Sequence, residues 1–200
     1  CNFYDVRTNR ARDTIAAACY TPTRPHSIVL WGDSFAQHLG RSLQRSLPPD
    51  VSLLQVATSG CTPRVHPVQP DAFGACNRSN AFLLDTVERV RPDVVVIAQQ
   101  HHHETTDWHE VARELRRRGA AHVVLLGPFP QWTSPLYRVV ARHFWPSPPA
   151  RIDRYLDPDV FATDRAMRER FGRSDDIQYL SMIDRLCDAH GCLAFLGPDV

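Results

Sequence analysis

The residues best suited to chemistry lie where an apolar run stops. In "SIVLWGDSFAQHLGRSL", residues 27–43, Gly32-Asp33-Ser34 separates an apolar run from a stretch with apolar residues at helical spacing. Gly32 permits a tight turn, and Asp33 could fix the loop through its carboxylate. The Ser34 backbone N–H would be an unpaired donor at a helix N-terminus, where an oxyanion is stabilised. Ser34 is therefore a candidate nucleophile, although a serine in an isolated tripeptide is more often a helix cap.

Two further apolar runs end in polar or glycine-containing sequence. Gly60, in "ATSGCTP", could bring a second backbone N–H toward the same ligand, or it could be an ordinary turn glycine. Gln100 follows the run "DVVVIA" and could supply a side-chain amide donor, or it could lie in solvent as a loop residue.

His101 and His103 alternate along the chain, so they would share one face of an extended segment. No nearby cysteine or carboxylate completes a ligand set, so no metal is expected there. The two histidines are interpreted as a polar rim that faces substrate or as ordinary solvated loop residues.

The elements that must position these residues alternate between short β-rich runs and longer helical stretches. Uniformly apolar strands separated by helices predict a parallel sheet covered on both faces, a doubly wound, flavodoxin-like α/β fold of about five strands. Ligands of such a sheet bind beyond the carboxyl ends of its strands, where the candidate residues lie. The expected strands are 27–31, 51–57, 93–98, 122–127 and 177–183, and the expected helices are 35–47, 80–91, 108–119 and 165–172.

Two segments fall outside this alternation. Residues 1–25 are interpreted as a lead-in tied by cysteines, within a single domain that spans residues 1–200. Residues 128–164 are rich in proline and aromatic residues and are predicted to form a long irregular excursion, as binding loops often do. Trp132 and Trp145 lie in the excursion, where they could stack on a sugar or pin the loop to the core.

Composition excludes several classes of function. The 200 residues are 43% hydrophobic, which fits one globular domain, and the formal net charge of +1 gives no sign of nucleic-acid binding. All 23 basic residues are arginine, which excludes a lysine Schiff base or a P-loop lysine. No loop is glycine-rich enough to wrap a phosphate, which disfavours a flavodoxin-type nucleotide binder.

The six cysteines form three sequence-local couples: Cys1 with Cys19, Cys61 with Cys76, and Cys187 with Cys192. An even number with local spacing favours structural disulfides and an oxidising compartment, although sequence alone does not fix the pairing. Zinc is the rival interpretation, but there is no CxxC motif, and buried free thiols are the third.

The motifs, taken in order, resemble those of the SGNH (GDSL-type) hydrolases. "VLWGDSFAQHL" is similar to the first block of that family, "ATSGCTP" to its glycine block, and "VVVIAQQ" lies where the family carries Gly-x-Asn. The closer resemblance is to the extracytoplasmic SGNH domain fused behind the membrane acyltransferase domain of bacterial sugar O-acetyltransferases. "AAACYTPTRPHSIVLWGDS", "RPDVVVIA", "VVLLGPFP" and a late "LC…GC" couple match that group in order.

The resemblance implies a role for three residues. Ser34 would be the nucleophile, and the N–H groups of Ser34 and Gly60 would form the oxyanion hole. Gln100 stands where the family has asparagine and would be the third donor. Ser34 would pass an acetyl group, through an acyl-serine, to a hydroxyl of a cell-envelope polysaccharide such as O-antigen. With water as acceptor, the same residues would make a carbohydrate esterase.

The resemblance also implies partners and a location. It implies no bound cofactor, because an N-terminal membrane acyltransferase domain would deliver the acetyl group from acetyl-CoA. The chain would then be the periplasmic C-terminal part of a longer protein tethered to the bacterial inner membrane.

The catalytic base is the main departure from the family pattern. The family carries Asp-x-x-His after its last cysteine couple, and no such motif follows Cys192. Asp188-Ala189-His190 has a different spacing and falls between the last two cysteines, so it is interpreted as a surface turn. The catalytic Asp and His are therefore expected beyond residue 200. The alternative is a catalytically silent domain that binds glycans.

Overall fold

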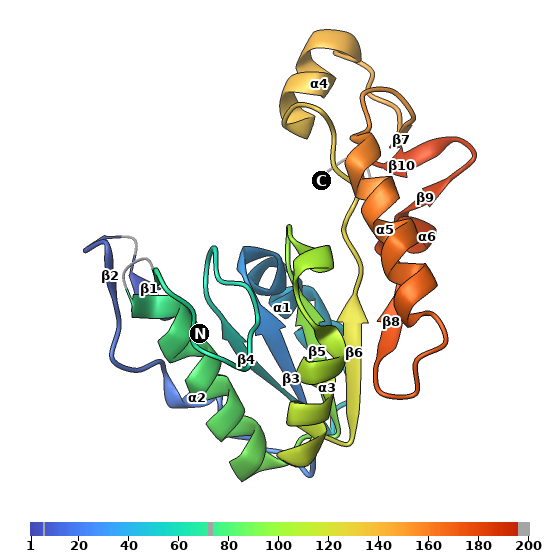
Figure 1. Cartoon of the computed structure of the whole chain (residues 1–200). Coiled ribbons are helices and arrows are strands. Elements are labelled where there is room, and N and C mark those ends of the chain that lie inside the picture. Colours follow the sequence, from blue (N-terminus) through green and yellow to red (C-terminus); the bar gives the residue numbers. More distant parts are fainter. Residues whose placement is uncertain (6, 72–73, 196–200) are drawn as a thin grey trace.

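The computed structural model describes residues 1–5, 7–71 and 74–195. At its centre lies a sheet of five parallel strands, and Figure 1 shows helices in front of it and behind it. The strands are β3 (His26–Gly32), β4 (Val51–Ala57), β5 (Val94–Ala98), β6 (His122–Leu126) and β8 (Gln178–Leu180). The longer helices are α1 (Ser34–Ser46), α2 (Ala75–Val90), α3 (Trp108–Arg117) and α5 (Pro158–Phe171).

The strands lie side by side in the order β4-β3-β5-β6-β8. If the five strands are numbered by their order along the chain, their order across the sheet is 2-1-3-4-5. This is the flavodoxin-like order, so the predicted doubly wound fold is confirmed. The chain winds to one side of β3 first and to the other side afterwards. A crevice is therefore expected between the carboxyl ends of β3 and β5.

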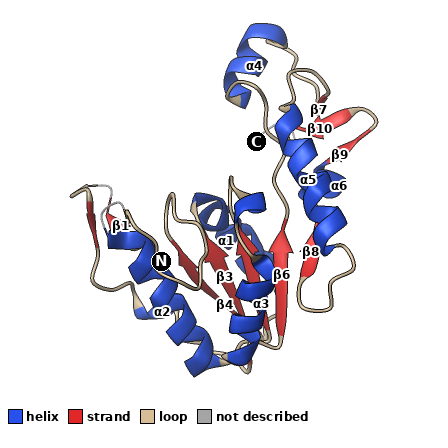
Figure 2. Ribbon diagram, in the orientation of Figure 1, coloured by secondary structure: helices blue, strands red, loops and turns tan. Residues whose placement is uncertain are grey.

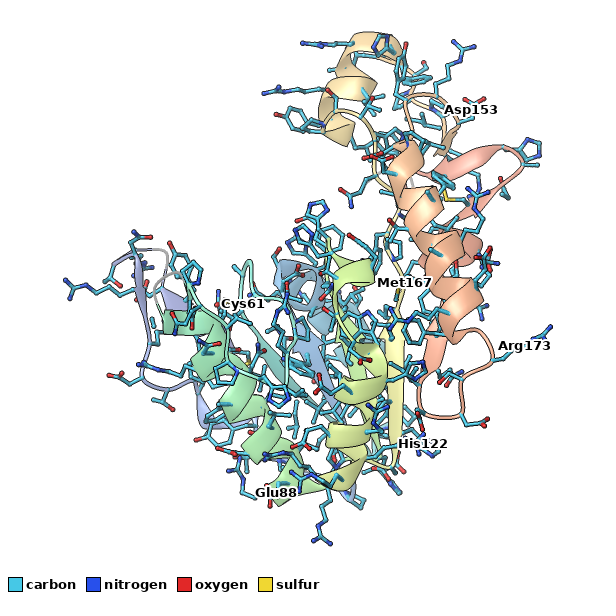
Figure 3. All side chains as sticks on the ribbon, viewed as in Figure 1. Cys61, Glu88, His122, Asp153, Met167 and Arg173 are labelled. Carbon is cyan, nitrogen blue, oxygen red and sulfur yellow. A yellow bond between two sulfur atoms is a disulfide. The ribbon has the colours of Figure 1, made fainter. Side chains whose placement is uncertain are left out.

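Side chains alternate between the two faces of the sheet, so each face has its own apolar cluster. The first face packs under α2, α3 and α5, and Met167 of α5 (Figure 3) belongs to its cluster. The second face packs against α1. The first cluster includes Trp31, Leu54, Leu83, Ile97, Trp108, Leu115, Leu125 and Phe171, and the second is built on Leu30, Ala36, Ala57, Ala98 and Leu126.

The second face is less completely covered than the first. Its side chains Val96, Val124 and Leu180, on β5, β6 and β8, remain partly exposed. Their neighbours on the first face, Val95 and Val123, are at most 1% exposed. Parallel sheets normally have both faces covered, so this part of the second face is unusually open.

The N-terminal lead-in forms β1 (Tyr4–Asp5), β2 (Arg10–Ala11) and the short helix η1 (Ala17–Cys19). It is attached to the end of β4, because the Ala57 N–H donates to the Cys1 carbonyl (3.1 Å) and the Phe3 N–H donates to Thr58 Oγ1 (3.1 Å). Phe3 is fully buried in the first cluster.

The prediction that residues 128–164 are irregular is wrong in part. This segment contains α4 (Leu136–His143), β7 (Arg151–Ile152) and the first turns of α5. Helix α5 begins at Pro158 because Asp157 caps it, accepting a hydrogen bond from the Asp159 N–H (3.0 Å), and proline is favoured at the first helical position. The high proline content of this segment favoured an irregular structure, although the Asp-Pro pair at the start of α5 indicates a helix N-terminus.

The chain ends in a small sheet rather than in one long strand. The expected strand 177–183 is reduced to β8, because Ser181 caps α6 (Met182–Leu186) by accepting from the Asp184 N–H (3.1 Å). Strand β10 (Gly191–Leu193) then pairs with β7 on one side and with β9 (Cys187–Asp188) on the other. No helix in the described ranges has both the length and the apolarity needed to cross a bilayer.

Three disulfides are present, in the pairs that sequence proximity predicts. The second of them ties the turn after β4 to the first turn of α2. The bonds join Cys1 to Cys19, Cys61 to Cys76 and Cys187 to Cys192.

Removal of the Cys61–Cys76 disulfide is expected to destabilise the protein more than removal of the Cys187–Cys192 disulfide. The bonds close loops with sequence separations of 15 and 5 residues, so their loss releases different amounts of chain entropy in the unfolded state. Urea unfolding of the two double Cys→Ser variants should show losses of about 3 and about 2 kcal/mol respectively. A larger loss for the shorter loop would contradict this expectation.

Candidate functional site

The corner at the end of β3 requires glycine. Gly32 has a φ of +153°, and a Cβ at this position would lie 1.7 Å from the Ala98 carbonyl oxygen. The strands β3 and β5 therefore approach each other closely at the point where the chain turns into α1. Any larger residue would push these two strand ends apart.

Asp33 joins the two sides of this corner. One carboxylate oxygen accepts from the Phe35 N–H (2.8 Å) and caps α1, and the other accepts from the Gln100 N–H (2.8 Å) beyond β5. The Asp33 N–H also donates to the Ala98 carbonyl (3.4 Å). Asp33 is only 8% exposed, so the carboxylate acts as a buried clamp between the helix start and the end of β5.

Ser34 is the first residue of α1 and is partly exposed. The cap is Asp33, so the interpretation of Ser34 as the helix cap is wrong. Within the described ranges, the Ser34 N–H donates no hydrogen bond, as expected for the first residue of a helix. A hydroxyl, an N–H donor without a partner in the described ranges and the positive end of a helix dipole thus meet at one residue.

The turn after β4 lies beside this residue. Residues 58–61 form a tight turn in which the Cys61 N–H donates to the Thr58 carbonyl (3.0 Å), and the Thr58 N–H donates to the Gly32 carbonyl (2.9 Å). Gly60 occupies the third position of the turn with a φ of +72°, which favours glycine. No atom lies within 4 Å of where its Cβ would be, so a ligand can approach this backbone.

Gln37, which was not among the residues predicted from the sequence, joins α1 to the end of β4 and to the turn that follows it. From the first turn of α1, its Nε2 donates to the Ala57 carbonyl (2.7 Å) and to Ser59 Oγ (3.3 Å). Asn2 of the lead-in reaches the same Ser59 hydroxyl (3.3 Å). The position of Gln37, three residues after Ser34 on the same helical face, was the available signal.

Gln100, the predicted third donor, is at the crevice. Its backbone N–H is held by Asp33, and its side chain is partly exposed. The preceding Gln99 is 1% exposed and bends the chain back by donating from Nε2 to the His101 carbonyl (2.7 Å).

The histidines do not form one shared face. His101 is exposed, as expected for a residue of a polar rim, but His103 is 1% exposed, so the prediction that it contacts substrate is wrong. The extended alternation breaks at His102, which has a φ of +65° and starts the short helix η3 (His103–Thr105). Burial lowers the pKa of His103 to about 4, against the opposing effects of Glu104 and of a hydrogen bond with the Leu126 backbone.

Trp132 is partly exposed and lies after β6, bridged to Leu156. Its ring nitrogen is buried without a partner in the described part of the chain. Within the same ranges, no group of three or more His, Cys, Asp or Glu side chains is placed to hold a metal ion.

Four cavities lie elsewhere on the described surface, and none of the four is lined by Ser34. The first, of about 210 Å³, lies between residues 64–67 and α2, and the other three border α3, α5 or β8. Ser34 itself is partly exposed at the start of α1.

Comparison with known proteins supports one family. The model of the family described as "SGNH domain (fused to AT3 domains)" matches residues 4–199. The periplasmic domain of a lipopolysaccharide acetyltransferase from Salmonella ser. Paratyphi A has a similar fold, with a TM-score of 0.76 and 20% sequence identity. The similarity covers 90% of this chain and 75% of that one. No curated protein sequence matches the chain.

Asp33→Asn is expected to lower the free energy of unfolding by about 2 kcal/mol, because one of two buried N–H donors would then face an amide NH₂ group. Asp157→Asn is the matched control, since Asp157 caps α5 with one carboxylate oxygen and asparagine caps equally well. Urea unfolding of both variants measures the difference. Equal losses would show that the bond to Gln100 contributes nothing.

Stability is expected to fall in mild acid because of His103. Between pH 6.5 and about 4 only the unfolded chain binds a proton at this side chain, so stability falls as pH falls and then levels off. The depressed pKa corresponds to a loss of about 3 kcal/mol over this window. His103→Gln, which does not titrate, should remove that part of the pH dependence in urea unfolding measured from pH 7.5 to 4. An unchanged curve in this variant would assign the acid sensitivity to other groups.

Proposed function

The chain belongs to the family of SGNH domains that are fused to AT3 domains, and on this premise we propose that it is a serine-dependent O-acetyltransferase domain. The observation that carries the proposal is the position of Ser34. It lies at the first turn of α1, next to the φ +72° turn of Gly60 and the clamped backbone of Gln100.

The reaction would begin with attack by Ser34 Oγ on the carbonyl carbon of an acetyl donor, while the serine proton passes to a base. The former carbonyl oxygen becomes negatively charged and would lie against the N–H groups of Ser34 and Gly60, with the Gln100 side chain as third donor. Collapse breaks the bond to the leaving group, which takes the proton from the base. Acetyl-Ser34 remains.

A sugar hydroxyl would then complete the transfer. It gives its proton to the same base and attacks the acetyl carbon, forming the new ester bond. The bond from Ser34 to the acetyl group breaks, and the proton returns to Ser34 Oγ. Gly60 and Ser34 would stabilise the second oxyanion as they did the first, because both intermediates place charge on the same oxygen.

The base is proposed to be a histidine of the Asp-x-x-His type that the family carries. The sequence from Cys192 to Val200 contains no histidine. His190 lies on an exposed turn, where Asp188 Oδ1 accepts from its backbone N–H (2.8 Å), so it is part of the small terminal sheet and is not assigned this role.

The acceptor is proposed to be a hydroxyl of a cell-envelope polysaccharide, and the donor an acetyl group passed on by an AT3 domain from acetyl-CoA. Support comes from the family description and from the fold shared with a periplasmic lipopolysaccharide acetyltransferase domain. The three disulfides suit an oxidising compartment, as the periplasm would provide. Release of the acetyl group to water would make the same site an esterase.

Ser34→Ala is expected to abolish covalent acetylation by an activated ester. Incubation of the chain with p-nitrophenyl acetate should add about 42 Da to the peptide that contains Ser34, because p-nitrophenolate leaves without being protonated and the proposed oxyanion hole favours attack by this serine over other serines, whose proton passes to water or buffer. Mass spectrometry of peptides measures this label. Ser42, exposed on the same helix, is the internal control and should stay unlabelled.

The outcome separates the proposed activities. Absence of the label at Ser34, or equal labelling of Ser42, would remove Ser34 from the mechanism and favour a silent glycan-binding domain. The ratio of acetylated sugar to free acetate would then distinguish a transferase from an esterase.

A further inference from the structure

One arm of the protein extends beyond the carboxyl ends of the strands. The chain leaves β6, and residues 131–133 lie antiparallel to residues 155–157, with α4 between them at the tip. Figure 2 shows α4 joined to the rest of the protein by two loop segments on the side of the sheet where the strands end. The Thr133 N–H donates to the Tyr155 carbonyl (2.8 Å), and the Asp157 N–H donates to the Gln131 carbonyl (2.9 Å).

The arm is also held in place by contacts with the small terminal sheet. Strand β7, near its end, pairs with β10, and Arg151 donates to the carbonyls of Leu186 (2.7 Å) and Gly191 (3.2 Å) and forms an ion pair with Asp188 (3.0 Å). The arm is therefore a preformed element, and a ligand that binds it has little backbone ordering to impose.

The arm carries an exposed aromatic surface. Tyr137, Trp145 and Tyr155 are 67%, 73% and 42% exposed, and in the described part of the chain they are all of the exposed large hydrophobic side chains. Their concentration within 19 residues is unlike the scattered exposure of single apolar residues that is normal for a protein surface. We define the aromatic surface as these three rings together with Arg138, Arg142 and Arg154.

Helix α4 presents part of this surface. Tyr137 and Ala141 are four residues apart on its exposed side, while Val139 and Val140 are buried on the opposite side. The exposed Trp145 follows the end of the helix. Arg138 and Arg142 form a neighbouring stripe. The Arg138 guanidinium lies 5.7 Å from the centre of the Tyr137 ring, and its Nε donates to the Tyr137 hydroxyl (3.0 Å).

The net charge of the aromatic surface is positive. The stretch from Leu136 to Tyr155 holds its three arginines and one acidic residue, Asp153. The fourth arginine of this stretch, Arg151, is already paired with Asp188. Arg142 and Arg154 have no ion-pair partner within the described ranges, and both are exposed. Unpaired guanidinium groups beside open rings suit a ligand that has both flat apolar faces and negative charges.

We propose that the aromatic surface binds an anionic polysaccharide, one whose sugars carry carboxylates or phosphates, and holds it beside Ser34. This inference rests on the proposed function, which requires a sugar hydroxyl at the carboxyl edge of the sheet. Sugar rings present flat faces of C–H groups that pack on Trp145 and Tyr137, and the anionic substituents pair with Arg142 and Arg154. The arm would thus select acidic glycans as acceptors.

Binding of polygalacturonate to the chain, followed by tryptophan fluorescence and calorimetry, tests the proposal. We expect saturable binding at least about 10-fold tighter than that of neutral dextran, because only the former satisfies the arginines. Trp145→Ala and Arg142→Ala should each weaken it about 5- to 10-fold, and Asp153→Asn should strengthen it by removing the one acidic residue. Arg173→Ala is the matched control, because Arg173 follows the far end of α5 and lies well away from Asp153 (Figure 3).

Three results would overturn the proposal: no binding of polygalacturonate, equal weakening by Arg173→Ala, or binding of phosphatidylethanolamine–phosphatidylglycerol vesicles through the aromatic surface without binding of the polysaccharide. Ser34→Ala should bind the polysaccharide as the wild-type chain does, and Trp145→Ala should still be acetylated at Ser34 by p-nitrophenyl acetate. A failure of glycan binding and a failure of the serine chemistry are therefore measured separately.

Discussion

The site depends on one buried carboxylate. Asp33 has no basic partner among the described residues, and its carboxylate instead accepts from two backbone N–H groups, one at the start of α1 and one beyond β5. A carboxylate that accepts such bonds fixes both donors in position, since moving either would leave a buried charge undersolvated. The direction of the Ser34 N–H and the location of Gln100 follow from the same group. The glycine at position 32 is the second half of this constraint, because it lets β3 and β5 come close enough for one side chain to bridge them.

The remaining supports of the corner come from residues distant in sequence. Gln37 joins the helix to the end of β4, Thr58 joins Phe3 of the lead-in to Ser79 of α2, and the Cys61–Cys76 disulfide closes the same turn. Each bond alone is worth about 1 kcal/mol or somewhat more. Together they fix the turn that contains Gly60, and a fixed backbone is what the proposed oxyanion hole would require.

The sheet and the corner could be predicted from sequence because their signals are local. Uninterrupted runs of apolar residues predicted β3, β4, β5 and β6 within one or two residues. The Gly-Asp-Ser sequence predicted the turn from β3 into a helix. The helix and strand of the arm could not be predicted in this way, because its many prolines indicate irregular structure and mask the helix cap at Asp157. The burial of His103 depends on the positive φ of His102, which ends the extended segment. The alternation of polar and apolar residues in the sequence does not predict such a backbone angle. The role of Gln37 depends on which strand end lies opposite, which is information about the fold rather than the sequence.

The uneven cover of the two sheet faces has a thermodynamic consequence. Val96 and Val124 are partly exposed on the strands that lead to the crevice, so any segment that packs over them gains apolar contact and binds only the folded chain. Such a segment, whether tethered or free, raises the unfolding free energy by mass action, and a covalent tether supplies it at millimolar effective concentration. The free energy of unfolding then increases with the fraction of molecules in which this face is covered.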